Sequence, residues 1–231
     1  MEITIDDWGL IPYGQAYEQQ KQCFDQAIQQ KMKGLPVENR VIFCEHPHVI
    51  TLGRNALSAN LLFPESILKE KQVALFQTDR GGDITYHGPG QIVGYPILDL
   101  ENFHIGLKEY IYRLEEIIIR TISDYGITGE RLNGATGVWI DANIPHKARK
   151  MAAIGVRSSR YVTMHGFALN VNTDLNYFQL INPCGFTDKG VTSVQKETGA
   201  EIAISEIKAV LIEQFNRRFM QILPRCSHPR R

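Results

Sequence analysis

Apolar residues recur at two different spacings along this chain, and the order of those spacings limits the possible folds. Helical spacing covers Tyr13–Met32 and Leu107–Ile122, the first segment ended by Gly34 and the second by Gly126. Short runs of β-favouring residues lie between and after them, without the regular strand–helix–strand rhythm of a parallel sheet. We therefore predict a single α+β domain over residues 1–231, with a mixed, largely antiparallel sheet flanked by helices.

The predicted strands are short and mostly bounded by glycine, proline or polar residues. They lie at 41–44, 49–52, 73–78, 84–86, 92–95, 138–140, 151–157 and 161–171, with a short helix at 64–72. A last helix carries apolar residues at 207, 210, 211, 215 and 219, and Ser205 is a plausible N-cap for it. We expect the basic tail 224–231 to be solvated and partly disordered.

Composition and charge exclude several classes of protein. The 25 basic residues balance the 25 acidic ones, so no global field favours nucleic acid or a membrane surface. The N-terminus has neither the basic nor the apolar region of a signal peptide, and no apolar run approaches the ~18 residues of a membrane span. The four cysteines, at 23, 44, 184 and 226, are far apart and form no CxxC pair. This pattern indicates a cytoplasmic protein with free thiols.

A glycine-rich stretch, Arg80–Gln91, is the first candidate for a binding site. Its four glycines and one proline remove side chains where a ligand or another backbone comes close. The glycine spacing fits neither a P-loop nor a dinucleotide fingerprint. His87 stands where bulky neighbours are missing, which favours a functional site, and Arg80 is suited to hold a carbonyl or phosphate. The alternative for the glycine-rich stretch is a pair of tight turns flanking an edge strand. The alternative for Arg80 is an ordinary surface arginine.

Two further stretches contain a possible nucleophile and a possible partner for it. Cys184 lies in Asn182–Phe186 and is followed by glycine, so its thiol is sterically open, although most lone cysteines are inert buried residues. Lys150 stands where a basic cluster runs into an apolar strand. Near Cys184, its ammonium would lower the pKa of the thiol, or a partly buried Lys150 would lose its proton and act as base. The alternative is a solvated basic turn.

Together these stretches resemble the octanoyltransferase family, also called lipoyl(octanoyl) transferases or lipoate-protein ligases B. Arg80–Gln91 carries the family's Arg-Gly-Gly-x-x-Thr-Tyr-His-Gly-Pro-Gly-Gln in full, and Asn182–Gly185 carries its Asn-Pro-Cys-Gly. Lys150–Arg157 and His165–Val171 match two further family motifs, and order and spacing hold over about residues 41–195. The resemblance implies a single α+β domain related to the biotin and lipoate protein ligases.

The resemblance also implies the reaction and its partners. Cys184 and Lys150 would form a cysteine/lysine dyad, in which Cys184 takes the octanoyl group from octanoyl-acyl carrier protein as a thioester. A lysine of an apo lipoyl domain would then receive it, in 2-oxoacid dehydrogenase complexes or the glycine cleavage H protein. This is the first step of endogenous protein lipoylation. It needs no cofactor and no metal.

By resemblance, three short segments would line the acyl and carbonyl site. Glycine and alanine there would leave a narrow slot for a straight alkyl chain, and backbone N–H groups would serve as an oxyanion hole. The expected residues are Arg80, Gly81, Gly82, Asp83, Ile84, Thr85, Tyr86, His87, Ala153, Ile154, Gly155, Gly166, Phe167 and Ala168.

Other functions remain open at this point. An ATP-dependent lipoate- or biotin-type protein ligase also uses a glycine-rich segment and a strand lysine, but it needs no cysteine, so Asn182–Gly185 favours the transferase. A scaffold protein without activity is disfavoured because both dyad residues are present. Cys44, His46 and His48 are two residues apart, so on a strand they would share one face, as zinc ligands can. A fourth ligand is missing nearby, which disfavours a zinc site.

The basic residues around Lys150 suggest a docking role. Lys147, Arg149, Arg157 and Arg160 are either solvated or guide acidic acyl carrier proteins and lipoyl domains by electrostatic steering.

Overall fold

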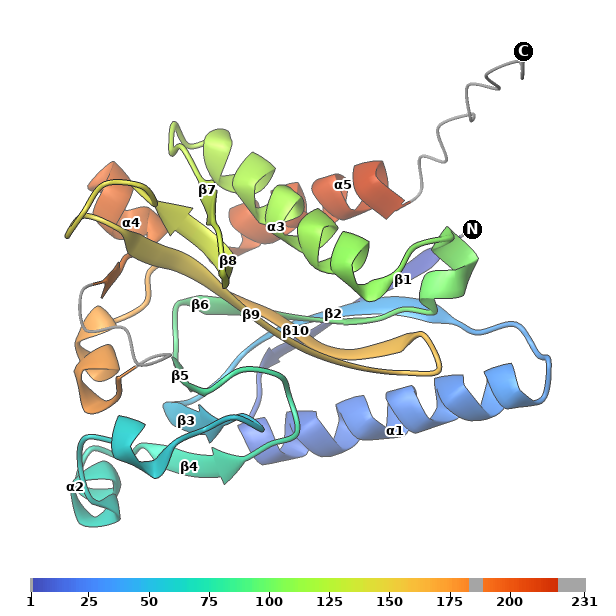
Figure 1. Ribbon diagram of the computed structural model, residues 1–231, viewed down its shortest axis with the longest axis horizontal. Helices are drawn as coiled ribbons and strands as arrows, with labels where there is room; N and C mark the ends of the chain where they lie inside the picture. Colours follow the sequence, from blue (N-terminus) through green and yellow to red (C-terminus); the bar gives the residue numbers. More distant parts are fainter. Residues whose placement is uncertain (1, 183–188, 220–231) are drawn as a thin grey trace.

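The main element of the structure is a sheet of eight strands (Figure 1). The computed structural model describes residues 2–182 and 189–219. The strand order is β1-β2-β6-β10-β9-β8-β7, and β11 pairs with β9. Neighbours run antiparallel except β1 with β2 and β11 with β9. The strands are β1 (Ile3–Leu10), β2 (Asn39–Glu45), β6 (Gln91–Ile97), β7 (Glu130–Leu132), β8 (Ala135–Ile140), β9 (Arg149–Ser159), β10 (Val162–Asn170) and β11 (Gly190–Val191).

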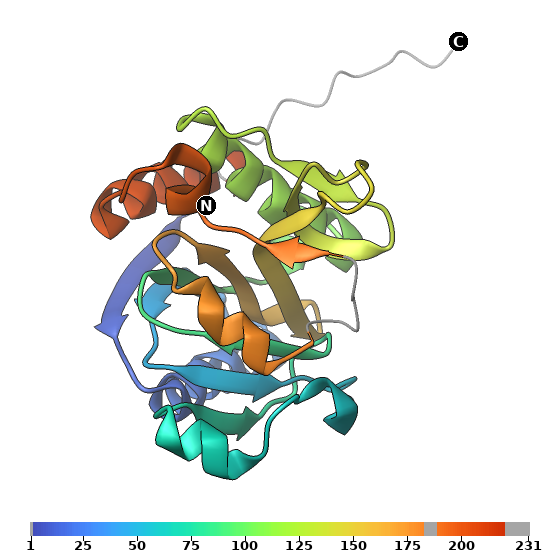
Figure 2. The same cartoon turned by 90° about the vertical axis from the view of Figure 1, so that its left-hand side faces the viewer.

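A smaller sheet packs beside the main one. In it β3 (Val49–Leu52) lies between β4 (Ala74–Gln77) and β5 (Ile84–His87). Figures 1 and 2 show this sheet, with α2 (Glu65–Glu70), on the side of the molecule opposite α3 and α5. Its own apolar cluster contains Ile50, Leu68 and Tyr86. Three short 3₁₀ helices complete the connections: η1 (Ser58–Asn60), η2 (Leu100–Phe103) and η3 (Leu175–Leu180).

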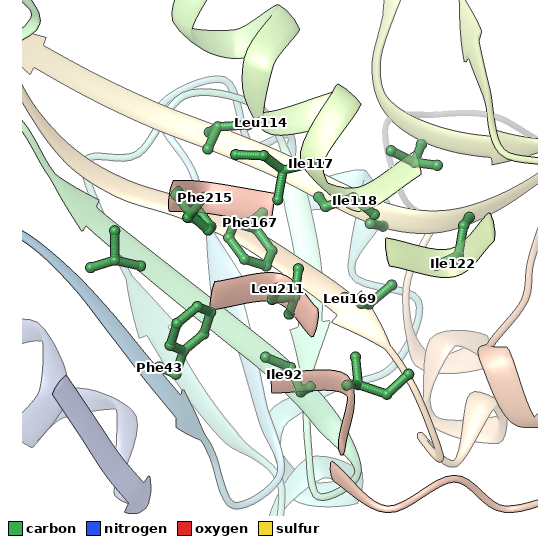
Figure 3. Packing of buried hydrophobic residues seen from close by; sticks show 14 of the residues in the cluster. Phe43, Ile92, Leu114, Ile117, Ile118, Ile122, Phe167, Leu169, Leu211 and Phe215 are labelled. Atoms are coloured by element: carbon green, nitrogen blue, oxygen red, sulfur yellow. The ribbon is translucent and has the colours of Figure 1, made fainter. Parts of the chain in front are cut away.

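Helices cover both faces of the main sheet because its strands are apolar on both faces. In β2, Val41 and Phe43 face the helices α3 (Leu107–Ser123) and α5 (Ile204–Phe219). Ile42 and Cys44 alternate with them and face α1 (Tyr13–Met32). Figure 3 shows side chains of α3 and α5 packed on strands β2, β6 and β10. The remaining helix is the short α4 (Val194–Thr198).

The α+β architecture with its largely antiparallel sheet confirms the predicted fold class. The helix predicted at 13–32 has those bounds, and the last helix begins at Ile204, so Ser205 lies inside it and is not its N-cap. The strands β1, β7 and β11 and the helix α4 were not predicted. Within the described ranges, none of the helices is long and apolar enough to cross a membrane. Cys184, Cys226 and the tail 224–231 lie outside those ranges.

Candidate active site

A cavity of about 520 Å³ brings together residues from both sheets and from the ends of two helices. Lys150 lines it, and so does every predicted binding residue except Tyr86. Tyr86 instead turns its hydroxyl toward His48, 2.7 Å from Nδ1, on the other side of β5. The cavity residues that the sequence did not single out are Tyr13, Val93, Tyr95, Leu107, Ile111, Gly134, Ala135, Thr136, Val156 and His165.

The glycines of the cavity wall let two backbones approach each other. β8 pairs with β9 only as far as Ala152, and beyond it the Gly81 N–H donates to the Val156 carbonyl at 3.0 Å. A Cβ on Gly155 would lie 2.7 Å from the Gly81 carbonyl oxygen, and a Cβ on Gly166 would overlap the Gly94 carbonyl oxygen. Backbone packing therefore requires these glycines, which also line the cavity. They are needed because segment 80–83 docks on β9, and β10 on β6.

Arg80 attaches this glycine-rich segment to the smaller sheet. Its side chain is buried, so it is not a surface arginine. Nη2 donates to the Thr51 carbonyl at 2.7 Å and to the Thr51 hydroxyl at 2.9 Å, and Nη1 donates to the Gly81 carbonyl at 3.1 Å. These bonds hold the loop over the cavity with a fixed, charged donor at its edge.

His87 is buried and uncharged in a network of fixed side chains. Gln91 donates through Nε2 to Asn170 Oδ1 at 2.9 Å, so its Oε1 is the acceptor for His87 Nδ1 at 2.7 Å. His87 Nδ1 therefore carries the proton, and Nε2 faces the Thr51 hydroxyl at 3.4 Å. Burial lowers the pKa of His87 to about 3, which keeps the ring neutral near pH 7.

His165 is a cavity residue that the sequence placed in a motif without assigning it a role. Its Nε2 lies 2.7 Å from Asp79 Oδ1, and Asp79 also pairs with Arg157. The hydrogen bond from His165 is the main cause that lowers the pKa of Asp79 to about 2. Burial lowers the pKa of His165 itself despite this carboxylate.

Lys150 stands between two cavities. It is the second residue of β9, where β8 lies on one side and Val191 of β11 pairs with it on the other, so it does not belong to a solvated turn. Its ammonium lies 4.6 Å from the centre of the Trp139 ring. The second cavity, of about 610 Å³, is also lined by Asn182 and Lys189, the described residues on either side of the segment that contains Cys184.

Among the residues of the zinc alternative, Cys44 Sγ lies 3.5 Å from His46 Nε2, and both histidines have further partners. His46 Nδ1 donates to the Ile11 carbonyl at 2.7 Å, and Nε2 accepts from the Tyr95 hydroxyl at 2.8 Å. Burial lowers the pKa of His46 to about 4. His48 stacks on Tyr177 with ring centres 4.1 Å apart. In the part of the chain that the structure describes, no three His, Cys, Asp or Glu side chains converge on a metal position.

Two of the four basic residues expected to guide docking, Arg149 and Arg157, lie far apart on one strand. Arg149 pairs with Asp141 and with Glu197, whereas Arg157 pairs with Asp79. Because both arginines lie on β9, eight residues separate them by about 26 Å. These two arginines do not form one patch, and each pairs with carboxylates of its own.

The fold and the site together define a lipoyl protein ligase A/B catalytic domain. The model of that family matches residues 18–216. A bipartite lipoate protein ligase of Thermoplasma acidophilum shares the fold, with a TM-score of 0.71 at 14% identity over 95% of this chain and 84% of that one. A lipoate-protein ligase A bound with ATP has a TM-score of 0.68 at 16% identity, covering 95% and 86%.

Relatives of higher identity narrow the assignment within this class. An octanoyltransferase of Bacteroides thetaiotaomicron is 57% identical over 208 residues, 90% of this chain and 91% of the relative. An octanoyltransferase of Cytophaga hutchinsonii is 45% identical over 234 residues, 98% and 96% of the two chains. The chain belongs to the octanoyltransferase family and is an acyltransferase.

Proposed function

We propose that this acyltransferase moves an octanoyl group from octanoyl-acyl carrier protein to a lysine of apo lipoyl domains, through a thioester on Cys184. Family membership supports octanoyl transfer in protein lipoylation. The acceptors are the lipoyl domains of 2-oxoacid dehydrogenase complexes and the glycine cleavage H protein. No cofactor takes part.

The position of Lys150 between the two cavities is the observation that carries the proposal. One cavity has apolar walls, including Ile84, Val93 and Ile154, that suit an alkyl chain. The other contains both described neighbours of the Cys184 segment. An acyl group held in the first cavity would thus present its carbonyl near Lys150, where the thiol can reach it.

The reaction has two halves that use the same two residues. Lys150 favours the thiolate of Cys184, which attacks the carbonyl carbon of the octanoyl thioester and expels the carrier's thiol, protonated as it leaves. The uncharged amine of the acceptor lysine then attacks the enzyme thioester, an amide forms, and the Cys184 thiolate leaves while the amine loses its extra proton. Lys150 carries protons in both halves, and backbone N–H groups of the cavity wall stabilise the oxyanion.

Intact-mass measurement tests the thioester. After incubation with octanoyl-acyl carrier protein and no ATP, we expect the wild-type protein to gain one octanoyl group, removable by hydroxylamine and transferable to an apo lipoyl domain. Cys184→Ala should gain nothing, and Lys150→Ala should acylate about 10²- to 10⁴-fold more slowly because the thiol loses its activating partner.

Two matched variants serve as controls. Cys23→Ala removes a thiol on α1 and Lys21→Ala removes an exposed lysine of the same helix, so both should behave as wild type. Transfer that appears only with ATP and free octanoate would contradict the proposal in favour of a ligase.

A further inference from the structure

The indole ring of Trp139 lies against the ammonium of Lys150 and is fixed there by its own strand. Trp139 is 1% exposed, and the centre of its ring lies 4.6 Å from Lys150 Nζ. Its Nε1 donates to the Ala135 carbonyl at 2.9 Å, so the ring cannot turn away without losing a hydrogen bond. Trp139 lines the second cavity and Ala135 lines the first. Strand β8 therefore borders both cavities, as Lys150 does.

The strands β8 and β9 are neighbours (Figure 1), and a bulge between them directs Lys150 to this ring. Val138 lies opposite Ala152 and Trp139 lies opposite Lys150, so Met151 is an extra residue on β9. Ala152 belongs to the apolar cluster under α3 and α5, and regular alternation would put Lys150 on that same face. Because of the extra residue, Lys150 shares the face of Trp139 instead.

The same strand leaves room for the lysine side chain. Gly137 has a φ of 128°, a conformation that favours glycine. A Cβ on Gly137 would lie 3.6 Å from Lys150 Cε and 2.5 Å from the Ala152 carbonyl oxygen. The Gly137 N–H donates to the buried carboxylate of Glu115 on α3 at 3.1 Å. The side chain of Lys150 is thus placed by β8, and α3 holds β8 at this point.

We propose that Trp139 is a positioning residue for acyl transfer, which holds the Lys150 ammonium at the junction of the two cavities and favours its charged form. This inference rests on the proposed function. When the Cys184 thiol gives its proton to the Lys150 amine, a thiolate and an ammonium form together. A ring that stabilises the ammonium therefore also raises the fraction of thiolate, which is the nucleophile.

The charges around Lys150 give the ring a purpose. Lys189 and Lys196 line the second cavity, and Arg80 and Asp83 line the first. Like charges disfavour one another's ionised forms, so the three cations oppose a charge on Lys150, whereas Asp83 favours it. The negative face of the indole adds an attraction for the ammonium without adding another ionisable group.

Fluorination of the ring tests this role, because it weakens the negative face of the indole with little change in shape. Trp139 is replaced by tryptophans that carry one to four fluorine atoms, and acylation at saturating octanoyl-acyl carrier protein is followed by intact mass. We expect the rate constant to fall stepwise, by about two- to thirtyfold in total, the range of a cation–π contact. The donor concentration that gives half the maximal rate should not change.

The same replacements at Trp8 are the matched control. Trp8 is the other tryptophan of the chain, lies on β1 and lines neither cavity. Its fluorination should leave the rate constant at the wild-type value. Trp139→Phe, which keeps a ring, should react faster than Trp139→Leu, which has none.

Alkylation of Cys184 by iodoacetamide, followed on its own peptide, is a second readout that needs no acyl donor. Its rate follows the fraction of thiolate, so it should fall in the same order along the fluorine series. Constant acylation and alkylation rates across a folded fluorine series would overturn the inference. A wild-type enzyme that takes no octanoyl group would instead overturn the proposed transfer, and the alkylation rates would still decide the role of Trp139.

Discussion

The two faces of the main sheet are built from different kinds of side chain. The face under α3 and α5 is aliphatic and aromatic, with Phe43, Phe167 and Phe215 in contact at its centre (Figure 3). The face under α1 contains buried histidines, His46 and His165, beside apolar side chains. The first arrangement maximises apolar burial, which stabilises the fold. The face under α1 buries less apolar surface and instead holds polar groups beside the cavity.

The difference lies in how each face is packed, not in distance from the site, because residues of both faces line the cavity. In β10, Phe167 packs under α5 and Ala168 faces α1, and both line it. A change among the aromatic rings should therefore alter mainly the free energy of unfolding, and a change at the histidines should alter its pH dependence.

The largest effect on stability is expected from Phe215→Ala on the apolar face. The ring is fully buried between Phe43, Phe167 and Phe219, so its loss should reduce the free energy of unfolding by about 3–5 kcal/mol. Urea denaturation measures this. Leu35→Ala, at an exposed position, should lie within about 0.5 kcal/mol of wild type. Equal free energies of unfolding for the two variants would contradict this prediction.

A smaller effect should appear on the histidine face as the pH falls. The pKa of His46 is lowered to about 4 by burial, so below its ordinary value of 6.5 the unfolded chain binds a proton that the folded chain does not. Stability therefore falls from pH 6.5 downward, by about 2 kcal/mol at pH 5 for each such histidine. Denaturation of His46→Gln should show a shallower pH dependence than wild type, while His104→Gln, exposed, should match wild type. Equal slopes for all three proteins would contradict the assignment.

The smallest effect is expected from Asp79→Asn, at the solvent edge of the same face. The Asp79 pKa of about 2 lies below its ordinary 3.8, so the carboxylate stabilises the fold above pH 4 and this contribution disappears as the pH falls through 2. Because the side chain is 33% exposed, screening reduces the expected loss at pH 7 to about 1 kcal/mol. Urea denaturation at low and high salt checks it: the loss should shrink with added salt. A loss independent of salt would indicate packing rather than charge.

The sequence predicts those elements whose spacing is regular. Helix Tyr13–Met32 is found with its predicted bounds, and α3 ends close to the predicted Ile122. β1 was missed because its residues are mostly exposed or half-buried, so it lacks a clear alternation. β7 and β11 contain three and two residues, too few for any periodicity. The N-cap prediction at Ser205 was wrong because the exact end of a helix depends on local backbone geometry, which residue spacing does not reveal.

The cavity residues also divide into those that the sequence predicted and those that only the structure reveals. Motifs identified most of them, and the structure brings those residues together with Lys150. Tyr13 and Tyr95 belong to a helix start and a strand that no motif covers, so only the tertiary arrangement adds them. Arg80 is buried rather than at the surface, and its bond to Thr51 of another strand was not predicted; its contact with a ligand stays a prediction. The role of Cys184 stays a prediction, since the residue lies outside the described ranges.

The contact of Gly81 with β9 has a consequence for association between molecules. From Ala153 onward, β9 lacks β8 as a neighbour, and the edge left there carries Val156, whose carbonyl accepts from Gly81. An uncovered strand edge is a template on which another chain can add by hydrogen bonding. The glycine-rich segment that borders the cavity therefore also covers this edge of β9. Displacing the segment would expose a strand edge on which a second molecule could pair.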